Sequence, residues 1–250
     1  MSEHPAIELR GVRKAFGASL VYDQLDLAVR RGETLGVLGP SGSGKSVLLK
    51  LIIGLIKPDA GVILVDGEDI TPLGERALRE VRRKVGMVFQ GAALFDSLTV
   101  GENVAYGLRE QVRWPPARVR ARVAECLAEV GLPAIEAMWP ADLSGGMKKR
   151  VGLARALAVG PEVILYDEPT TGLDPTNSRR INELIMKMQE RHGVTSLVIT
   201  HDIASALRVA TRIALVDERR ICTPVAVAVA RDAPPPSLET FLHGREPEEP

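Results

Sequence analysis

The sequence predicts an α/β protein built on a parallel sheet. Short apolar runs that are typical of buried strands alternate with stretches of helical periodicity over much of the chain. A glycine-rich loop at residues 39–46 separates one such strand from a helix, and a second buried strand, residues 163–166, ends in two acidic residues. Strands that alternate with helices favour a parallel sheet covered on both faces.

The composition fits one large α/β domain, or a domain with a sizeable insertion. In the 250-residue chain, hydrophobic residues make up 45%, and 32 basic residues balance 32 acidic ones. This balance gives no whole-protein attraction to nucleic acid, and we expect none as a partner. No stretch approaches the roughly 20 apolar residues that span a bilayer, and the N-terminus has no apolar signal segment, so we expect a soluble, cytoplasmic protein. The two cysteines and four histidines form no metal-binding or redox motif.

The first part of the chain reads mainly as strands. Three segments carry β-branched and apolar residues between polar breaks and are predicted strands: 7–16, 21–29 and 33–38. A helix is expected over 46–56, with Pro58 soon after its end. Residues 61–70 are predicted to form another strand with a turn at Asp66 and Gly67.

The second part of the chain is more helical. Residues 92–160 have few strand signals, and we predict a helical insertion there. A helix, a strand and a short helix are expected after the buried strand, at 177–193, 196–202 and 204–210. Residues 1–230 are predicted to form the folded domain, and residues 231–250, rich in proline and acid, a partly ordered tail with a frayed end.

The glycine-rich loop, GPSGSGKS, fits the phosphate-loop pattern in full and lies between a strand and a helix, as that pattern requires. Gly42 and Gly44 let the backbone curl so that N–H groups point at phosphate oxygens, and the helix adds its positive end. Lys45 is expected to reach the β- and γ-phosphates, and the Ser46 hydroxyl to ligate Mg²⁺. The predicted nucleotide-binding residues here are Gly39, Pro40, Ser41, Gly42, Ser43, Gly44, Lys45, Ser46 and Val47.

Two acids stand at the end of the buried strand 163–166. Ligands of open α/β sheets bind at the carboxyl ends of strands, so Asp167 is predicted to hold Mg²⁺, through water. Glu168 is then placed to orient and polarise an attacking water. Alone, such a pair could be a solvated turn; together with the phosphate loop, it indicates a hydrolase that binds ATP or GTP.

The stretch LSGGM, residues 143–147, opens a helix with two glycines, although glycine is a poor helix former. Ser144 is a good N-cap, and Gly145 and Gly146 leave the N–H groups of the first turn open to an anion. A second phosphate site on the same chain suggests a head-to-tail dimer with two nucleotides between the subunits. For Lys148 and Lys149, which follow, we favour a solvated face over phosphate attraction.

The ordered set of motifs resembles the ATPase subunit of an ABC transporter over nearly the full chain. That resemblance implies a P-loop ATPase domain with a parallel core sheet, a small antiparallel β subdomain and a helical subdomain at about 92–160. It implies ATP and Mg²⁺ as cofactors, an ATPase activity, a homodimer and an integral membrane permease as partner.

The family's residue roles carry over onto matching positions. Phe16 matches the aromatic that stacks on adenine, and Gln90 the glutamine that touches Mg²⁺ and senses the permease. Ser144, Gly145 and Gly146 match the segment that binds the partner subunit's γ-phosphate. Asp174 matches an aspartate at the dimer interface, and His201 a histidine that contacts the γ-phosphate. The predicted catalytic residues are Lys45, Gln90, Glu168 and His201, and the predicted Mg²⁺ ligands are Ser46, Gln90 and Asp167.

Met147 departs from the glutamine that many transport ATPases carry after LSGG. Together with residues 91–110, it resembles the ATPases of Mla-type phospholipid transporters, which work with MCE-domain proteins and, in some systems, a small accessory subunit. Residues 236–244 resemble that subfamily's C-terminal extension, which reaches the neighbouring ATPase. The location implied is the cytoplasmic face of the inner membrane. An ATPase for another solute, a non-transport ABC ATPase and a catalytically dead module are the alternatives.

Overall fold

The computed structural model describes residues 4–112 and 114–243. The chain divides into two compact units. The first unit comprises Met1–Val81 and Thr195–Pro250, and the second unit comprises Arg82–Val194. Within the described part of the chain, no helix is both long and apolar enough to cross a membrane.

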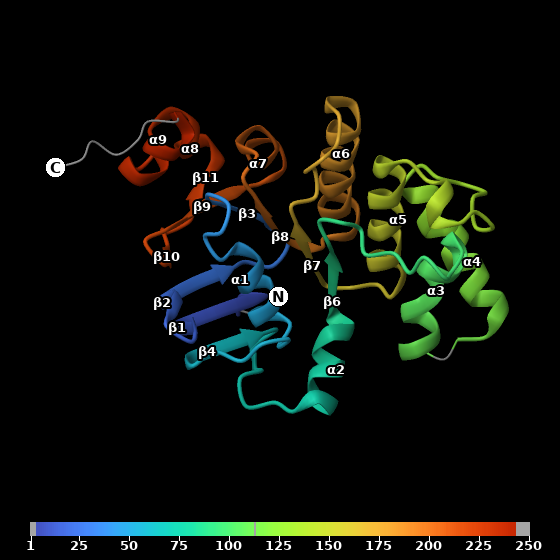
Figure 1. Ribbon diagram of the computed structural model, residues 1–250, viewed down its shortest axis with the longest axis horizontal. Helices are drawn as coiled ribbons and strands as arrows, with labels where there is room; N and C mark the ends of the chain where they lie inside the picture. The colour runs from blue at the N-terminus through green and yellow to red at the C-terminus, as the bar shows by residue number, and fades with distance from the viewer. Residues whose placement is uncertain (1–3, 113, 244–250) are drawn as a thin grey trace. The chain divides into compact units, whose positions relative to one another are not determined.

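The first unit contains a small antiparallel sheet and a mainly parallel one (Figure 1). The antiparallel sheet has the order β2-β1-β4-β5, with β1 Ile7–Phe16, β2 Ser19–Val29, β4 Ala60–Val65 and β5 Glu68–Asp69. In the other sheet, β3 (Thr34–Leu38) runs parallel to both β8 (Thr195–Thr200) and β9 (Arg212–Asp217). Two short strands, β10 Arg220–Ile221 and β11 Val225–Ala226, pair antiparallel with β9.

The helices of the first unit begin with α1 (Lys45–Ile52), which directly follows the phosphate loop. It ends four residues earlier than the predicted 56, because the chain turns at Gly54, whose φ of 64° is left-handed. The remaining helices are α7 Ile203–Val209, α8 Val227–Asp232 and α9 Pro236–His243. Helix α2 (Glu75–Lys84) leads from the first unit into the second.

The tail is partly helical. Leu238 of α9 is buried in one cluster with Leu38, Ala206, Ile213, Leu215 and Ala230, so α9 packs on the core of its own chain. The frayed end predicted for the last residues, 244–250, lies outside the described residues.

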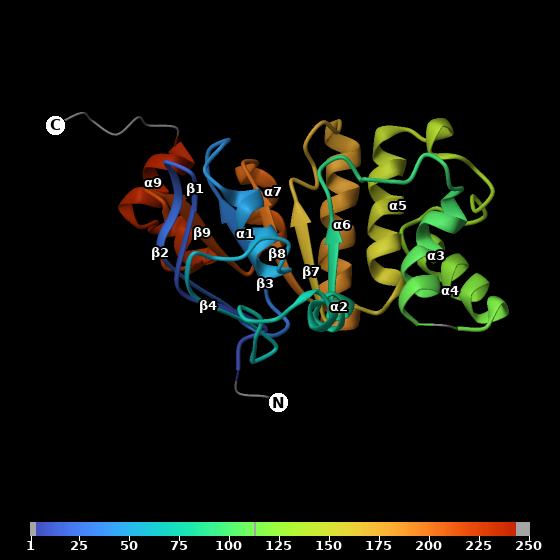
Figure 2. The ribbon, with the colours of Figure 1, turned by 60° about the horizontal axis from the view of Figure 1, so that its bottom comes forward.

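The second unit pairs two parallel strands with a group of helices. Strand β6 (Val85–Val88) runs parallel to β7 (Val163–Asp167), and α6 (Pro175–His192) follows β7. Between the strands, α3 Val100–Gln111, α4 Pro116–Glu129 and α5 Gly145–Ala158 lie side by side in both views (Figures 1 and 2). A short 3₁₀ turn, Pro140–Asp142, precedes α5. The described residues from 89 to 162 contain no strand.

Candidate functional site

The phosphate loop has the curled backbone that the sequence predicts. Gly42 and Gly44 have φ values of 81° and 97°, and Gly44 caps α1 in the left-handed conformation. A Cβ on Gly44 would lie 2.6 Å from Val21 Cγ1, so the position also excludes a side chain. Among the described residues, no side chain caps α1 and none in its first turn is acidic. Its N-terminal N–H groups therefore suit an anion.

Lys45 lies across this loop. Its side chain is buried, and Nζ donates hydrogen bonds to the carbonyl oxygens of Gly39 at 2.7 Å and Pro40 at 2.9 Å. Ser46, the next residue, is exposed. The buried ammonium, the exposed residue Ser46 and the uncapped N-terminus of α1 form a donor set that fits nucleotide phosphates with Mg²⁺.

His201 shares the edge of the sheet with this loop. Strand β8 pairs with β3 so that Thr200 lies opposite Leu38, and His201 and Gly39 are the next residue in each strand's direction. The carboxyl ends of two neighbouring parallel strands thus bring the histidine and the loop to one edge. Phe16, at the end of β1, is 49% exposed, and Lys14 Nζ lies 5.2 Å from its ring centroid.

In the second unit, Gln90, Asp167 and Glu168 gather in the same way. Val88 of β6 lies opposite Tyr166 of β7, so both strands end at one edge and deliver these residues there. Gln90 is exposed, whereas Glu168 is only 8% exposed and has a left-handed φ of 47°. Thr171 Oγ1 donates a hydrogen bond of 3.0 Å to Glu168 Oε2.

The prediction that Lys149 is solvated is wrong. The residue is 6% exposed, and its Nζ donates to the carbonyl oxygens of Glu168 at 3.2 Å and Thr171 at 2.7 Å. Burial lowers the pKa of Lys149, and the Glu168 carboxylate opposes this effect. Lys148 is half-buried.

The signature segment, Leu143–Met147, begins α5 as predicted. Ser144 is the N-cap, and its Oγ accepts a 3.3 Å hydrogen bond from the Met147 N–H. The two glycines differ. A Cβ on Gly145 would meet only Leu173 Cδ2, at 3.9 Å, so the helix end is open there, whereas a Cβ on Gly146 would lie 2.6 Å from Asn177 Oδ1. Gly145 therefore keeps the N-terminus accessible to an anion, and Gly146 allows α6 to pack closely.

Asp174 caps α6. Its Oδ1 accepts hydrogen bonds from the N–H groups of Thr176 at 2.9 Å and Asn177 at 3.0 Å. Hydrogen bonds from Asn177 lower the pKa of Asp174, whose side chain is exposed. The second unit thus contains these predicted site residues: Gln90, Asp167, Glu168, Ser144, Gly145, Gly146 and Asp174.

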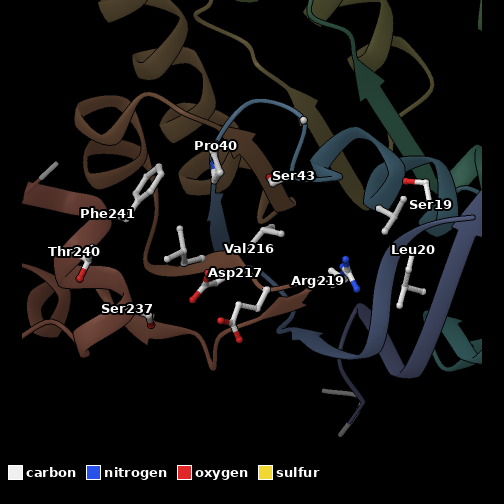
Figure 3. A pocket seen from close by; sticks show the side chains of 14 residues that line it. Ser19, Leu20, Pro40, Ser43, Val216, Asp217, Arg219, Ser237, Thr240 and Phe241 are labelled. Carbon is white, nitrogen blue, oxygen red and sulfur yellow. The ribbon is translucent and has the colours of Figure 1, made fainter. Parts of the chain in front are cut away.

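The sequence analysis missed three residues that contact these site residues and their loop: Lys149, Thr171 and Asn177. Their contacts join segments about 20 to 30 residues apart, so local patterns do not show them. It also missed a cavity of about 590 Å³ in the first unit, whose lining includes Pro40, Ser43, Arg219, Thr240 and Phe241. In Figure 3, Phe241 points from α9 toward Pro40 of the phosphate loop.

Comparison with known proteins identifies a family. The model of the ABC transporter family matches residues 22–171. Among curated relatives, the chain is 40% identical over 242 residues to the "Probable ribonucleotide transport ATP-binding protein mkl" of Mycobacterium tuberculosis, covering 96% of this chain and 67% of that protein. It is 44% identical to the "Methionine import ATP-binding protein MetN" of Nocardia farcinica, covering 98% and 76%. It is 40% identical to the "Intermembrane phospholipid transport system ATP-binding protein MlaF" of Haemophilus influenzae, covering 86% and 81%.

Solved structures agree with this result. The ATP-binding cassette MJ0796, in a dimeric post-hydrolysis state bound to ADP and Pi, superposes with a TM-score of 0.82 at 34% identity and covers 88% of this chain and 98% of its own. CbiO1 of Clostridium perfringens, part of the CbiONQ transporter complex, superposes with a TM-score of 0.84 at 28% identity, covering 93% of each chain.

Proposed function

The chain belongs to the ABC transporter family as an ATPase subunit, and we propose that two copies dimerise head to tail to drive a permease that moves phospholipids between membranes. The main support for this dimer is that the chain has two helix N-termini suited to phosphate, at α1 and α5. Of these two helices, α1 follows the phosphate loop that bears Lys45, whereas α5 has no such loop before it. The open N-terminus at Gly145 is then available to the γ-phosphate of a nucleotide held by the partner subunit's loop.

Each predicted residue has a role in this mechanism. The loop amides and Lys45 bind the β- and γ-phosphates, and Phe16 stacks on the adenine. Ser46, Gln90 and, through water, Asp167 would hold Mg²⁺, which would offset the charge that develops on the phosphates. Glu168 orients the attacking water and accepts its proton. His201 of the same chain contacts the γ-phosphate, and the signature segment of the other subunit binds that γ-phosphate as well.

Hydrolysis therefore depends on positioning more than on covalent chemistry. Binding of two ATP molecules closes the dimer, with Asp174 at the interface, and hydrolysis reopens it. We propose that Gln90 transmits this movement to the permease.

A docking surface for the permease is proposed around residues 91–110. Phe95 and Tyr106 are 42% and 44% exposed, although large aromatic side chains are usually buried. Their ring centroids are 4.7 Å apart, and the Arg155 guanidinium lies 5.8 Å from the Phe95 centroid. Such a paired, exposed aromatic patch suits an apolar segment of a membrane protein's cytoplasmic loop.

Phospholipid as the substrate is supported by Met147, by residues 91–110 and by the resemblance to the MlaF protein of Haemophilus influenzae. An MCE-domain protein and a small accessory subunit would then complete the complex at the cytoplasmic face of the inner membrane. The 44% identity to a methionine import ATPase favours a second candidate, the ATPase subunit of a small-solute importer.

Purification from native membranes through an N-terminal tag, with proteins and lipids identified, tests the substrate. Recovery of a permease with an MCE-domain protein and phospholipid supports lipid transport. Recovery of another permease with a solute-binding protein replaces the substrate and keeps the ATPase assignment. Docking is tested by cross-linking from Leu98 or Thr99 in the assembled complex, where the absence of any permease contact contradicts the proposed surface.

The dimer is tested separately, by light scattering on Glu168→Gln with ATP. That variant should bind ATP and accumulate as a dimer, because it lacks the carboxylate that activates water. A Lys45→Ala control should bind nucleotide poorly and stay monomeric. A Glu168→Gln chain that binds ATP and remains monomeric, with its permease present, contradicts the head-to-tail dimer.

A further inference from the structure

Lys149 makes a contact that the roles above leave unexplained. It lies in the second turn of α5, the helix whose first turn carries Gly145 and Gly146. Its ammonium donates to two backbone carbonyl oxygens of the Glu168 loop, which we define as residues 168–174, at 3.2 Å and 2.7 Å. Burying an ammonium is costly unless its hydrogen bonds are made, so these two bonds fix where the loop lies against the helix.

Glu168 needs such support. Its left-handed φ of 47° is unfavourable for a residue with a side chain and persists only where the surroundings enforce it. The Glu168 carbonyl oxygen accepts from both Lys149 Nζ and the Thr171 N–H, the latter at 3.3 Å. The Glu168 carboxylate accepts from the Thr171 hydroxyl, and the Thr171 carbonyl oxygen accepts from Lys149. These three residues form a closed ring of hydrogen bonds that holds the carboxylate.

A second contact joins the same two segments. Gly146, one turn before Lys149, packs so closely on Asn177 that no Cβ would fit. Asn177 in turn bonds to Asp174, at the end of the Glu168 loop. Helix α5 therefore contacts both ends of the stretch from Glu168 to Asn177.

We propose that Lys149 is a positioning residue that joins α5 and the Glu168 loop into one rigid piece, so that an anion bound at the N-terminus of α5 sets the position of the Glu168 carboxylate. This inference rests on the proposed dimer. There, the α5 N-terminus faces the nucleotide held by the partner subunit, whereas Glu168 acts on the nucleotide held by its own chain. Lys149 thus links the two nucleotide sites of the dimer.

Lys149→Met tests the positioning role, because methionine keeps the length of the side chain and removes the ammonium. We expect kcat for ATP hydrolysis to fall about a hundredfold, because displacing a catalytic group by about 1 Å has an effect of this size. The dissociation constant for ATP should stay within about twofold of the wild-type value, because binding depends on the phosphate loop. Lys149→Arg should restore much of kcat, since it returns a cation of similar reach.

Lys148→Met is the matched control, since it makes the same chemical change one residue away, and it should hydrolyse ATP like the wild type. Thermal unfolding of each variant separates misplacement from loss of fold. Thr171→Val, which removes only the hydroxyl on the carboxylate, gives a second and smaller perturbation of the same ring. A Lys149→Met chain with wild-type kcat overturns the inference and leaves the proposed function intact.

Mixed dimers test the link between sites. When one chain carries Lys45→Ala, the remaining active site uses the other chain's phosphate loop and Glu168, together with the first chain's signature segment. The α5 N-terminus of the chain with the intact loop then faces the emptied site, so the link predicts less than half of the wild-type rate. Lys149→Met should reduce the rate further in the chain with the intact loop, whose Glu168 acts, and not in the chain with Lys45→Ala. A mixed dimer with half of the wild-type rate before Lys149 is changed overturns the link, and an equal defect of Lys149→Met in either chain overturns the positioning role. A Glu168→Gln chain that binds ATP and stays monomeric with its permease present overturns the proposed dimer, and with it this inference.

Discussion

The contact between Gly146 and Asn177 allows a worked prediction. In Gly146→Ala, the new Cβ would lie 2.6 Å from Asn177 Oδ1 and 2.7 Å from Asn177 Cγ. Asn177 cannot turn aside freely, because its side-chain amide and its backbone N–H both bond to Asp174. Overpacking of this kind costs about 1–3 kcal/mol, and alanine returns up to about 1 kcal/mol of helix propensity. A net loss of about 1 kcal/mol should lower Tm by about 2–4 °C in a chain of this size.

Gly145→Ala should behave in the opposite way. Its Cβ would meet nothing closer than Leu173 Cδ2 at 3.9 Å, so the substitution should raise stability by about 0.4–1 kcal/mol. The methyl group would nevertheless stand at the open N-terminus of α5, and ATP hydrolysis should fall. Thermal unfolding without nucleotide, followed by circular dichroism, and steady-state hydrolysis measure the two effects.

The double variant Gly146→Ala/Asn177→Ala identifies the cause of the loss. Removal of the Asn177 side chain should relieve the clash, so the double variant should be more stable than the sum of the single changes by about 1 kcal/mol. Additivity within about 0.5 kcal/mol would refute the packing argument. Gly145→Ala with unchanged hydrolysis would refute the anion site at α5.

Three further predictions concern the tail, a helix cap and the adenine platform. Leu238→Ala should cost about 2–4 kcal/mol in urea unfolding, because the side chain is only 3% exposed among the residues that anchor α9; an unchanged midpoint contradicts this docking. The pKa of Asp174 lies below its ordinary value of 3.8, so its stabilising effect is complete above that pH and is lost as pH falls through the folded-state pKa. The stability difference between wild type and Asp174→Ala in urea should therefore shrink below about pH 3.8, and a constant difference would argue against the charged cap. Phe16→Ala should leave Tm unchanged, since the ring is half exposed, but weaken ATP binding about tenfold in a fluorescence titration.

The features that the sequence predicted correctly depend on local signals. Ser144 begins α5 because a serine N-cap and two small residues suit the first turn, and that information lies within a few neighbouring positions. Strand β7 is buried from residue 163 to residue 166 and ends at the half-buried Asp167, as its run of apolar residues indicates. The curl of the phosphate loop follows from glycines that need left-handed φ values.

The burial of Lys149 could not be found from charge pattern alone. Two consecutive lysines on a helix are usually solvated, and only the face that packs against the Glu168 loop decides which of them is buried. A signal was nevertheless present. Gly146, Lys149 and Leu153 recur at helical spacing and are all buried, so the lysine lies on the same face as a glycine and a leucine. A lysine in line with small and apolar residues should therefore be tested as a buried donor before it is assigned to solvent.

The position of α9 restricts how the tail can act on a partner subunit. Burial of a leucine side chain stabilises the folded state by about 1.5–3 kcal/mol. The cost of exposing Leu238 alone would therefore shift the equilibrium between undocked and docked α9 toward the docked form by about tenfold or more. Thr240 and Phe241, on the same helix, line the cavity beside Pro40 of the phosphate loop. A partner that contacts the tail would therefore meet α9 while it remains docked on its own chain. Any effect of that contact on nucleotide binding would be transmitted through the lining of this cavity, to which α9 and the phosphate loop both contribute residues.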